Sequence, residues 1–179
     1  MPFPGVQSFG YLIEEALIGE VKSQLGEDSE NYPDPEWLKL RKVSRAGGRP
    51  LMTPSREEQP LVWFEYIAGS GQGYELGRQL PARAEEIWNV FAVMQLKPDD
   101  MGLGRDEEQF KAWANASADT LMRRLAKVLT EFTPQVADPI TGLAPWSQNV
   151  TTWAMVGQST QQFSIIYRIA LRYVIETSI

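Results

Sequence analysis

The stretch 161–179 alternates apolar and mixed positions with a period of two residues. Every odd position from Phe163 to Ile175 is apolar, which is the pattern of a strand with one buried face. Several of the same residues also fit helical spacing, so a helix is the alternative interpretation. The abundance of Ile, Val and Tyr favours the strand, and we therefore predict a final strand within a sheet.

Three shorter runs predict further strands. Residues 61–68 read LVWFEYIA, and residues 87–96 are similarly apolar on both faces. Strands of this kind are central in a sheet or covered by a partner, and we expect these two to pair, directly or through a segment around 74–80. A turn at 69–73 should end the first of them. Residues 150–156 form a short strand, and turn residues at 157–160 lead into the final strand to make a β-hairpin.

Two segments have the periodicity of amphipathic helices. In residues 8–25, Ser8 is a suitable N-cap, an apolar stripe follows, and Gly26 is a suitable stop. Residues 106–133 predict a longer helix that begins at Asp106 and has a charged outer face. The charged residues expected largely opposite the stripe of the first helix are Glu14, Glu15, Glu20 and Lys22.

These elements predict an α+β fold for a single domain spanning residues 1–179. A mixed or antiparallel β-sheet would carry the N-terminal helix and the long helix packed on it, with a closing C-terminal β-hairpin. Residues 27–60 contain five prolines and the pair Gly47–Gly48, and they predict an extended arm or insertion. Residues 134–149, with further Pro and Gly breakers, predict an irregular loop.

Composition narrows the chemistry available. The chain has no cysteine and no histidine, which removes thiolate nucleophiles, Ser-His pairs and the usual zinc sites. A net charge of −6 and a pI near 4.8 disfavour a general nucleic-acid binder. The N-terminal residues lack the pattern of a signal peptide, and no apolar run reaches the roughly 18 residues of a membrane span. We expect synthesis in the cytoplasm.

Two patterns could be taken for ligand sites. Residues 69–73 are rich in glycine, but they lack the Gly-Lys-Ser/Thr of a phosphate loop, so a hairpin turn is the better interpretation. A group of acids could bind a hard cation, although a helix dipole explains those nearest 106. We therefore expect no metal, no cofactor and no catalytic residue. The acids in question are Asp99, Asp100, Asp106, Glu107 and Glu108.

Carboxylates offer a further possibility. The pairs Glu14–Glu15 and Glu85–Glu86 are adjacent in sequence, so their side chains point in different directions. Glu65 interrupts an apolar strand and could be buried with a shifted pKa. The favoured interpretation of Glu65 is an ion pair, with a neighbouring chain or with one of two arginines of the final strand, Arg168 or Arg172.

One cluster of positive charge stands out in this acidic chain. Five basic residues lie within the eleven positions 39–49, close to a tryptophan. This pattern predicts a partner-binding arm for an acidic protein surface or a nucleic-acid backbone, and a solvated loop is the alternative. We expect that deleting 39–49 weakens assembly and leaves the fold intact. The predicted partner-binding residues are Trp37, Lys39, Arg41, Lys42, Arg45 and Arg49.

The order of these elements resembles the tail-terminator proteins of long-tailed bacteriophages, which include tail-completion and neck proteins. The resemblance implies a small α+β subunit of a hexameric ring that caps the tail tube and provides the head-joining surface. It implies a structural virion protein and not an enzyme. The implied partners are further copies of the chain, the tail tube protein and the head–tail connector or neck proteins, with DNA passing through the lumen without sequence-specific binding.

Other functions remain open on the sequence. The two-faced strands carry more apolar surface than one small domain covers, which favours self-association. Another neck or head-completion protein would fit as well, and so would a cytoplasmic adaptor that binds an acidic partner. A carboxylate or metal-dependent enzyme would need Glu65 and the acids of 99–108 to converge in one pocket.

Overall fold

The computed structural model describes residues 9–27, 29, 38–45, 59–72, 83–96, 107–137, 147–159 and 164–176. Within them lie two helices and five strands in an α+β arrangement, as predicted. Their bounds are α1 Phe9–Leu25, β1 Lys42–Arg45, β2 Leu61–Gln72, β3 Arg83–Gln95, α2 Glu107–Glu131, β4 Ser147–Ser159 and β5 Ser164–Glu176.

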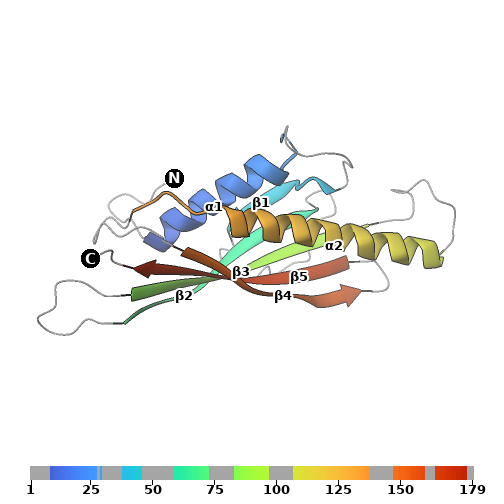
Figure 1. Cartoon of the computed structure of the whole chain (residues 1–179). Coiled ribbons are helices and arrows are strands. Elements are labelled where there is room, and N and C mark those ends of the chain that lie inside the picture. The colour runs from blue at the N-terminus through green and yellow to red at the C-terminus, as the bar shows by residue number, and fades with distance from the viewer. Residues whose placement is uncertain are drawn as a thin grey trace, which may run out of the picture.

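The strands form one sheet in the order β1-β2-β3-β5-β4 (Figure 1). β1 runs parallel to β2 and the other neighbours are antiparallel, so the sheet is mixed. The final segment is a strand, as predicted, and it lies between β3 and β4. β2 pairs directly with β3, which is one of the two predicted arrangements, and the closing β4–β5 hairpin is confirmed.

Three strands, β2, β3 and β4, are longer than predicted, and β3 begins at Arg83 instead of residue 87. β4 begins at Ser147 and runs through the expected turn to Ser159, and its register against β5 shifts twice. These irregularities break the two-residue period by which a strand is recognised in sequence. The predicted turn at 69–73 is also wrong in its described part, because Gly69 to Gln72 pair with β3. Pairing with a neighbouring strand overrides the low β-propensity of glycine here.

Both helices lie on the same face of the sheet (Figure 1). α1 contacts β1 and β2, whereas α2 contacts β4 and β5. The core between the helices and the sheet is continuous, and its largest side chains are fully buried. These are Trp88, Phe64, Ile13, Leu17, Leu121, Met122, Leu125 and Leu129.

A second apolar cluster lies on the opposite face of the sheet. It contains Leu61, Trp63 and Val93, with Phe91 packed against them. The Trp63 and Phe91 rings stack with centroids 5.0 Å apart and planes inclined by 16°. Since Val62 and Phe64 are buried among the helices, the first four residues of β2, Leu61–Phe64, are buried on both faces, as the sequence predicts.

The structure corrects the prediction of an extended arm at 27–60 for residues 38–45, whereas residues 28, 30–37 and 46–58 lie outside the described residues. Leu38, Leu40 and Val43 are buried, and Leu40 N donates to Leu25 O at 2.8 Å. The apolar residues here are too few to show a period, and β1 has only four residues. Deleting 39–49 would remove β1 and two buried side chains, so the expectation of an intact fold is wrong.

The loop predicted at 134–149 is partly corrected. Residues 134–137 have no regular structure, as expected, and so do residues 132–133, which were predicted to end the helix, whereas residues 147–149 belong to β4. The remaining positions of this loop lie outside the described residues.

The end of α1 requires glycine, which gives a test of the fold. A Cβ on Gly26 would lie 2.5 Å from the Lys22 carbonyl oxygen, whereas a Cβ on Gly19 would meet nothing within 4 Å. We expect Gly26→Ala to destabilise the fold by more than about 1 kcal/mol. The matched variant Gly19→Ala should stabilise it by up to about 1 kcal/mol, since alanine is the better helix former. Urea unfolding measures both, and effects of the same sign would contradict this account.

Candidate functional site

The basic segment predicted to bind a partner leads into the edge strand β1. Lys39 and Arg41 immediately precede β1, and Lys42 and Arg45 are its first and last residues. Trp37 and Arg49 lie outside the described residues. The structure therefore brings four of the predicted residues onto one short segment, but it gives them different surroundings.

Arg41 and Lys42 are the exposed members of this segment. Arg41 Nε lies 3.5 Å from Glu27 Oε1, and the two side chains are 51% and 58% exposed. An exposed ion pair of this kind contributes between zero and about 1 kcal/mol. It could be exchanged for contacts with another molecule at little cost.

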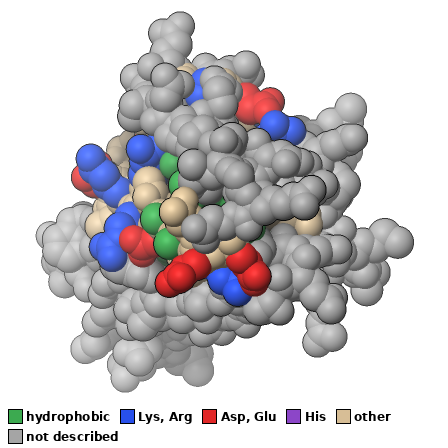
Figure 2. Space-filling view, turned by 90° about the vertical axis from the view of Figure 1, so that its right-hand side faces the viewer, with side chains coloured by type: hydrophobic (Ala, Val, Ile, Leu, Met, Phe, Trp, Pro, Cys, Tyr) green, Lys and Arg blue, Asp and Glu red, His purple; other side chains and the backbone are tan. Residues whose placement is uncertain are grey.

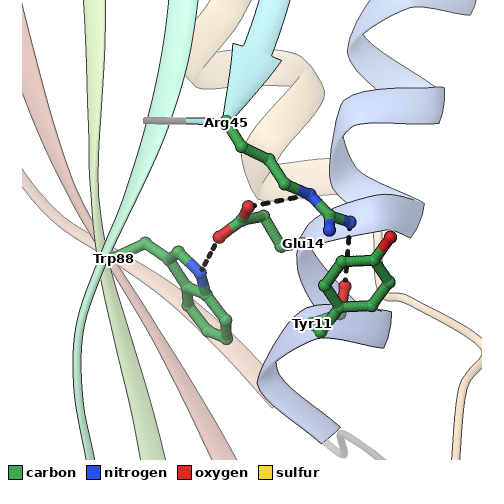
Figure 3. Close-up of polar contacts among 4 residues, drawn as sticks. All are labelled: Tyr11, Glu14, Arg45 and Trp88. Carbon is green, nitrogen blue, oxygen red and sulfur yellow. Dashed lines mark hydrogen bonds and ion pairs between the residues drawn. The ribbon is translucent and has the colours of Figure 1, made fainter. Parts of the chain in front are cut away.

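Arg45, by contrast, turns toward the interior. It is paired with Phe64 in the β1–β2 register, so its side chain emerges on the face that carries the helices. Its Nε lies 3.0 Å from Glu14 Oε1, and a guanidinium Nη donates to the Tyr11 carbonyl oxygen at 3.3 Å. The guanidinium also lies over the Tyr11 ring, 3.4 Å from its centroid (Figure 3).

Glu14 is the centre of this arrangement. It is only 8% exposed, and its Oε2 accepts a hydrogen bond of 3.1 Å from Nε1 of the fully buried Trp88 (Figure 3). One carboxylate on α1 therefore joins β3 in the middle of the sheet to β1 at its edge. We call Tyr11, Glu14, Arg45 and Trp88 the Glu14 cluster.

The electrostatics of the cluster are set by competing effects on Glu14. Burial raises the pKa of Glu14, whereas the Trp88 N–H and the Arg45 charge lower it, and burial dominates. The carboxylate is therefore paired and hydrogen-bonded, yet its charged form is still disfavoured relative to water.

Sequence reasoning placed Glu14 on the wrong side of its helix. Glu14 precedes Leu17 by three residues and Val21 by seven, which is the spacing of one helical face. That signal was present, but a charged residue is rarely fully buried unless it is paired. Glu15 is exposed, as expected for a neighbour that points in a different direction.

Glu65 is not the buried carboxylate that its sequence context suggests. It is only partly buried and lies in register with Asn89 of β3. Arg168 and Arg172 belong to β5, which lies beyond β3. They are two strand spacings away from Glu65, about 10 Å, so the predicted ion pair would have to reach over β3.

Only two of the five acids of the predicted cation site lie in the described part of the chain. Glu107 and Glu108 are exposed in the first turn of α2. Glu107 pairs with Lys111 at 2.6 Å, and this hydrogen bond, with the Lys111 charge, lowers the pKa of Glu107. Asp99, Asp100 and Asp106 lie outside the described residues. Within the part of the chain that is described, no three acidic residues are grouped so as to hold a metal ion.

The surface carries charges of both signs. Figure 2 shows acidic and basic side chains intermixed around a few apolar ones on the described part of one face. No large field of one sign is visible among them. In the segments described here, neither helix is long and apolar enough to cross a membrane.

Comparison with known proteins adds little to this picture. Neither a protein-family model nor a curated protein matches the sequence. One solved structure, of a protein without a descriptive name, matches 92% of this chain and 96% of its own at 14% identity, with a TM-score of 0.42. A TM-score this low supports no conclusion about the function of this chain.

The balance of effects on Glu14 can be tested by titration. Arg45→Gln removes the charge that lowers the pKa of Glu14, so we expect that pKa to rise further above its usual range. The carboxyl carbon resonance of Glu14, followed by NMR against pH, measures it. Arg41→Gln is the matched control, because Arg41 pairs with Glu27 instead. An unchanged Glu14 titration in Arg45→Gln would contradict the contact.

Proposed function

We propose that this chain is a structural assembly protein of a bacteriophage tail or neck. In this proposal the protein is a tail terminator, and six copies of it form a ring that caps the tail tube and provides the head-joining surface. The observation that carries the proposal is the edge strand β4, which supports self-association through the sheet.

β4 has thirteen residues and pairs with β5 on one side. Among the described strands none pairs with its other side, so a row of backbone N–H and C=O groups points outward there. The sequence SQNVTTWAMVGQS contains no charged residue and no proline. Charges and prolines are the usual means of blocking an exposed edge. The two register shifts act against a flat edge, but they leave its full length uncharged.

The opposite edge of the sheet is different. β1 has only four residues, and Lys42 and Arg45 occupy its two ends, which is the kind of charged, short edge that resists pairing. The sheet thus has one protected edge and one unprotected edge. Unlike surfaces on one subunit favour head-to-tail contacts, which close into a ring when the rotation between subunits fits.

The basic segment supplies a second contact in this proposal. Arg41 and Lys42 are exposed beside the protected edge and would dock on an acidic surface of the tail tube or the connector. The remaining charge of the chain is acidic, with a net charge of −6. An acidic lumen would let DNA pass without being held.

The edge strand can be tested directly. We expect the protein to run at the mass of six chains by light scattering after size exclusion, either alone or after contact with tail tubes. Ala154→Lys places a charge in the middle of β4 and should yield monomers with unchanged circular dichroism. Ala112→Lys, at an exposed position of α2, is the control and should assemble normally. A native chain that stays monomeric even with tail tubes would overturn the proposal.

The basic segment has a test of its own. Arg41→Gln combined with Lys42→Gln should weaken capping of tubes polymerised from the cognate tube protein, because both side chains are exposed and long-range attraction is lost. Tube lengths in electron micrographs measure capping. Lys111→Gln with Arg123→Gln removes the same charge from exposed positions of α2 as a control. Equal tube lengths for the two double variants would remove the basic segment from the docking surface.

A further inference from the structure

We propose that the contact between Glu14 and Arg45 is a latch that holds the basic strand β1 against the fold and releases it for assembly. Only the role of release in assembly rests on the proposed function. The latch itself is a property of the free protein, and it can be tested there.

The start of β1 is fixed by the residues that lead into it, since Leu40 is buried and Arg41 N donates to Pro60 O, whereas its C-terminal end has fewer contacts. β1 has four residues at the edge of the sheet, and it pairs with β2 over those four positions. Val43 is its only buried side chain. The contacts of Arg45 with Glu14 and Tyr11 therefore make up a large share of what fixes the C-terminal end of the strand.

The two residues of the latch differ in how exposed they are and in how firmly they are held. The Glu14 side chain is 10% exposed and that of Arg45 is 27% exposed. Glu14 belongs to α1 and is also held by the buried Trp88, so the carboxylate stays in place when Arg45 leaves. Arg45 is partly hydrated already, which lowers the cost of its moving into water or onto an acid of another molecule.

The groups around Glu14 allow its charge to be switched in place. Arg45 on β1 and Trp88 on β3 contact it, and Tyr11 on α1 contacts Arg45. The Tyr66 ring of β2 packs edge-on against Trp88, with centroids 5.3 Å apart. Glu14 is the only carboxylate among them. A protonated carboxyl group can still accept the Trp88 hydrogen bond, so protonation removes the ion pair alone.

The direction of the pH effect separates the latch from ordinary acid unfolding. Because burial raises the pKa of folded Glu14 above that of the unfolded chain, the folded state binds this proton more readily. The contribution of Glu14 to stability is therefore present at low pH and is lost as pH rises through the raised pKa. As pH falls, Glu14 is protonated and β1 should open. Over the same pH range, the contribution of Glu14 to the stability of the whole fold should increase.

The test compares Glu14→Gln with Glu15→Gln, its exposed neighbour on the same helix. Glutamine keeps an acceptor for Trp88 but has no charge for Arg45. We expect about tenfold faster amide exchange at Val43–Arg45 in Glu14→Gln, the loss of an interaction of about 1.4 kcal/mol. Trypsin cleavage after Lys42 and Arg45 should accelerate similarly. The urea midpoint should not fall, and it should rise to the extent that the neutral side chain avoids the cost of burying a charge. Glu15→Gln should match the native chain in all three.

The pH dependence completes the experiment. In the native chain, exchange at Val43–Arg45, corrected for the intrinsic rate, should rise as pH falls through the Glu14 titration, and in Glu14→Gln this dependence should be absent. Unchanged exchange in Glu14→Gln, or acceleration only in step with a lower urea midpoint, would overturn the latch. If β1 opens in Glu14→Gln but capping of tail tubes is unaffected, the latch stands and its link to assembly is discarded.

Discussion

A single buried carboxylate joins three parts of this fold that are distant in sequence. Glu14 lies on α1, accepts a hydrogen bond from Trp88 on β3 and pairs with Arg45 on β1. Buried ion pairs often add little net stability, because desolvation offsets the attraction between the charges, and the raised pKa of Glu14 shows that offset here. Its contribution is one of position, since it fixes where the helix and the edge strand sit on the sheet.

The rest of the architecture follows from that placement. α1 covers the β1–β2 side of the sheet and α2 covers the β5–β4 side, so one helix is assigned to each edge. The edge under α1 is short, charged and tied down, whereas the edge under α2 is long and uncharged. This asymmetry distinguishes the chain from a symmetric two-layer domain, and in the proposed function it would set the direction in which subunits associate.

Periodicity predicted the parts of the fold that obey it. The alternation in β5, the two-faced pattern of β2 and the helical stripes all gave correct elements, because burial imposes a regular spacing on them. β1 was missed since four residues are too few to show a period. Glu14 was misplaced because an ion pair formed across 31 positions of sequence with Arg45 leaves no local signal. Of the four predicted binding residues that the structure describes, Arg41 and Lys42 are the two that are exposed, as their charge suggested.

The irregularity in β2 has a consequence for the shape of the sheet. Tyr66 pairs with Trp88 and Ala68 with Ile87, so Ile67 is an extra residue between two consecutive pairs. Removing it would leave every remaining pair in register, and the pairing therefore does not depend on it. What Ile67 adds is a local increase in strand twist and an apolar side chain, 49% exposed, next to the equally exposed Tyr66. The bulge therefore changes the shape of the sheet without changing which residues of β2 and β3 pair, so it could be gained or lost without altering the packing of the core.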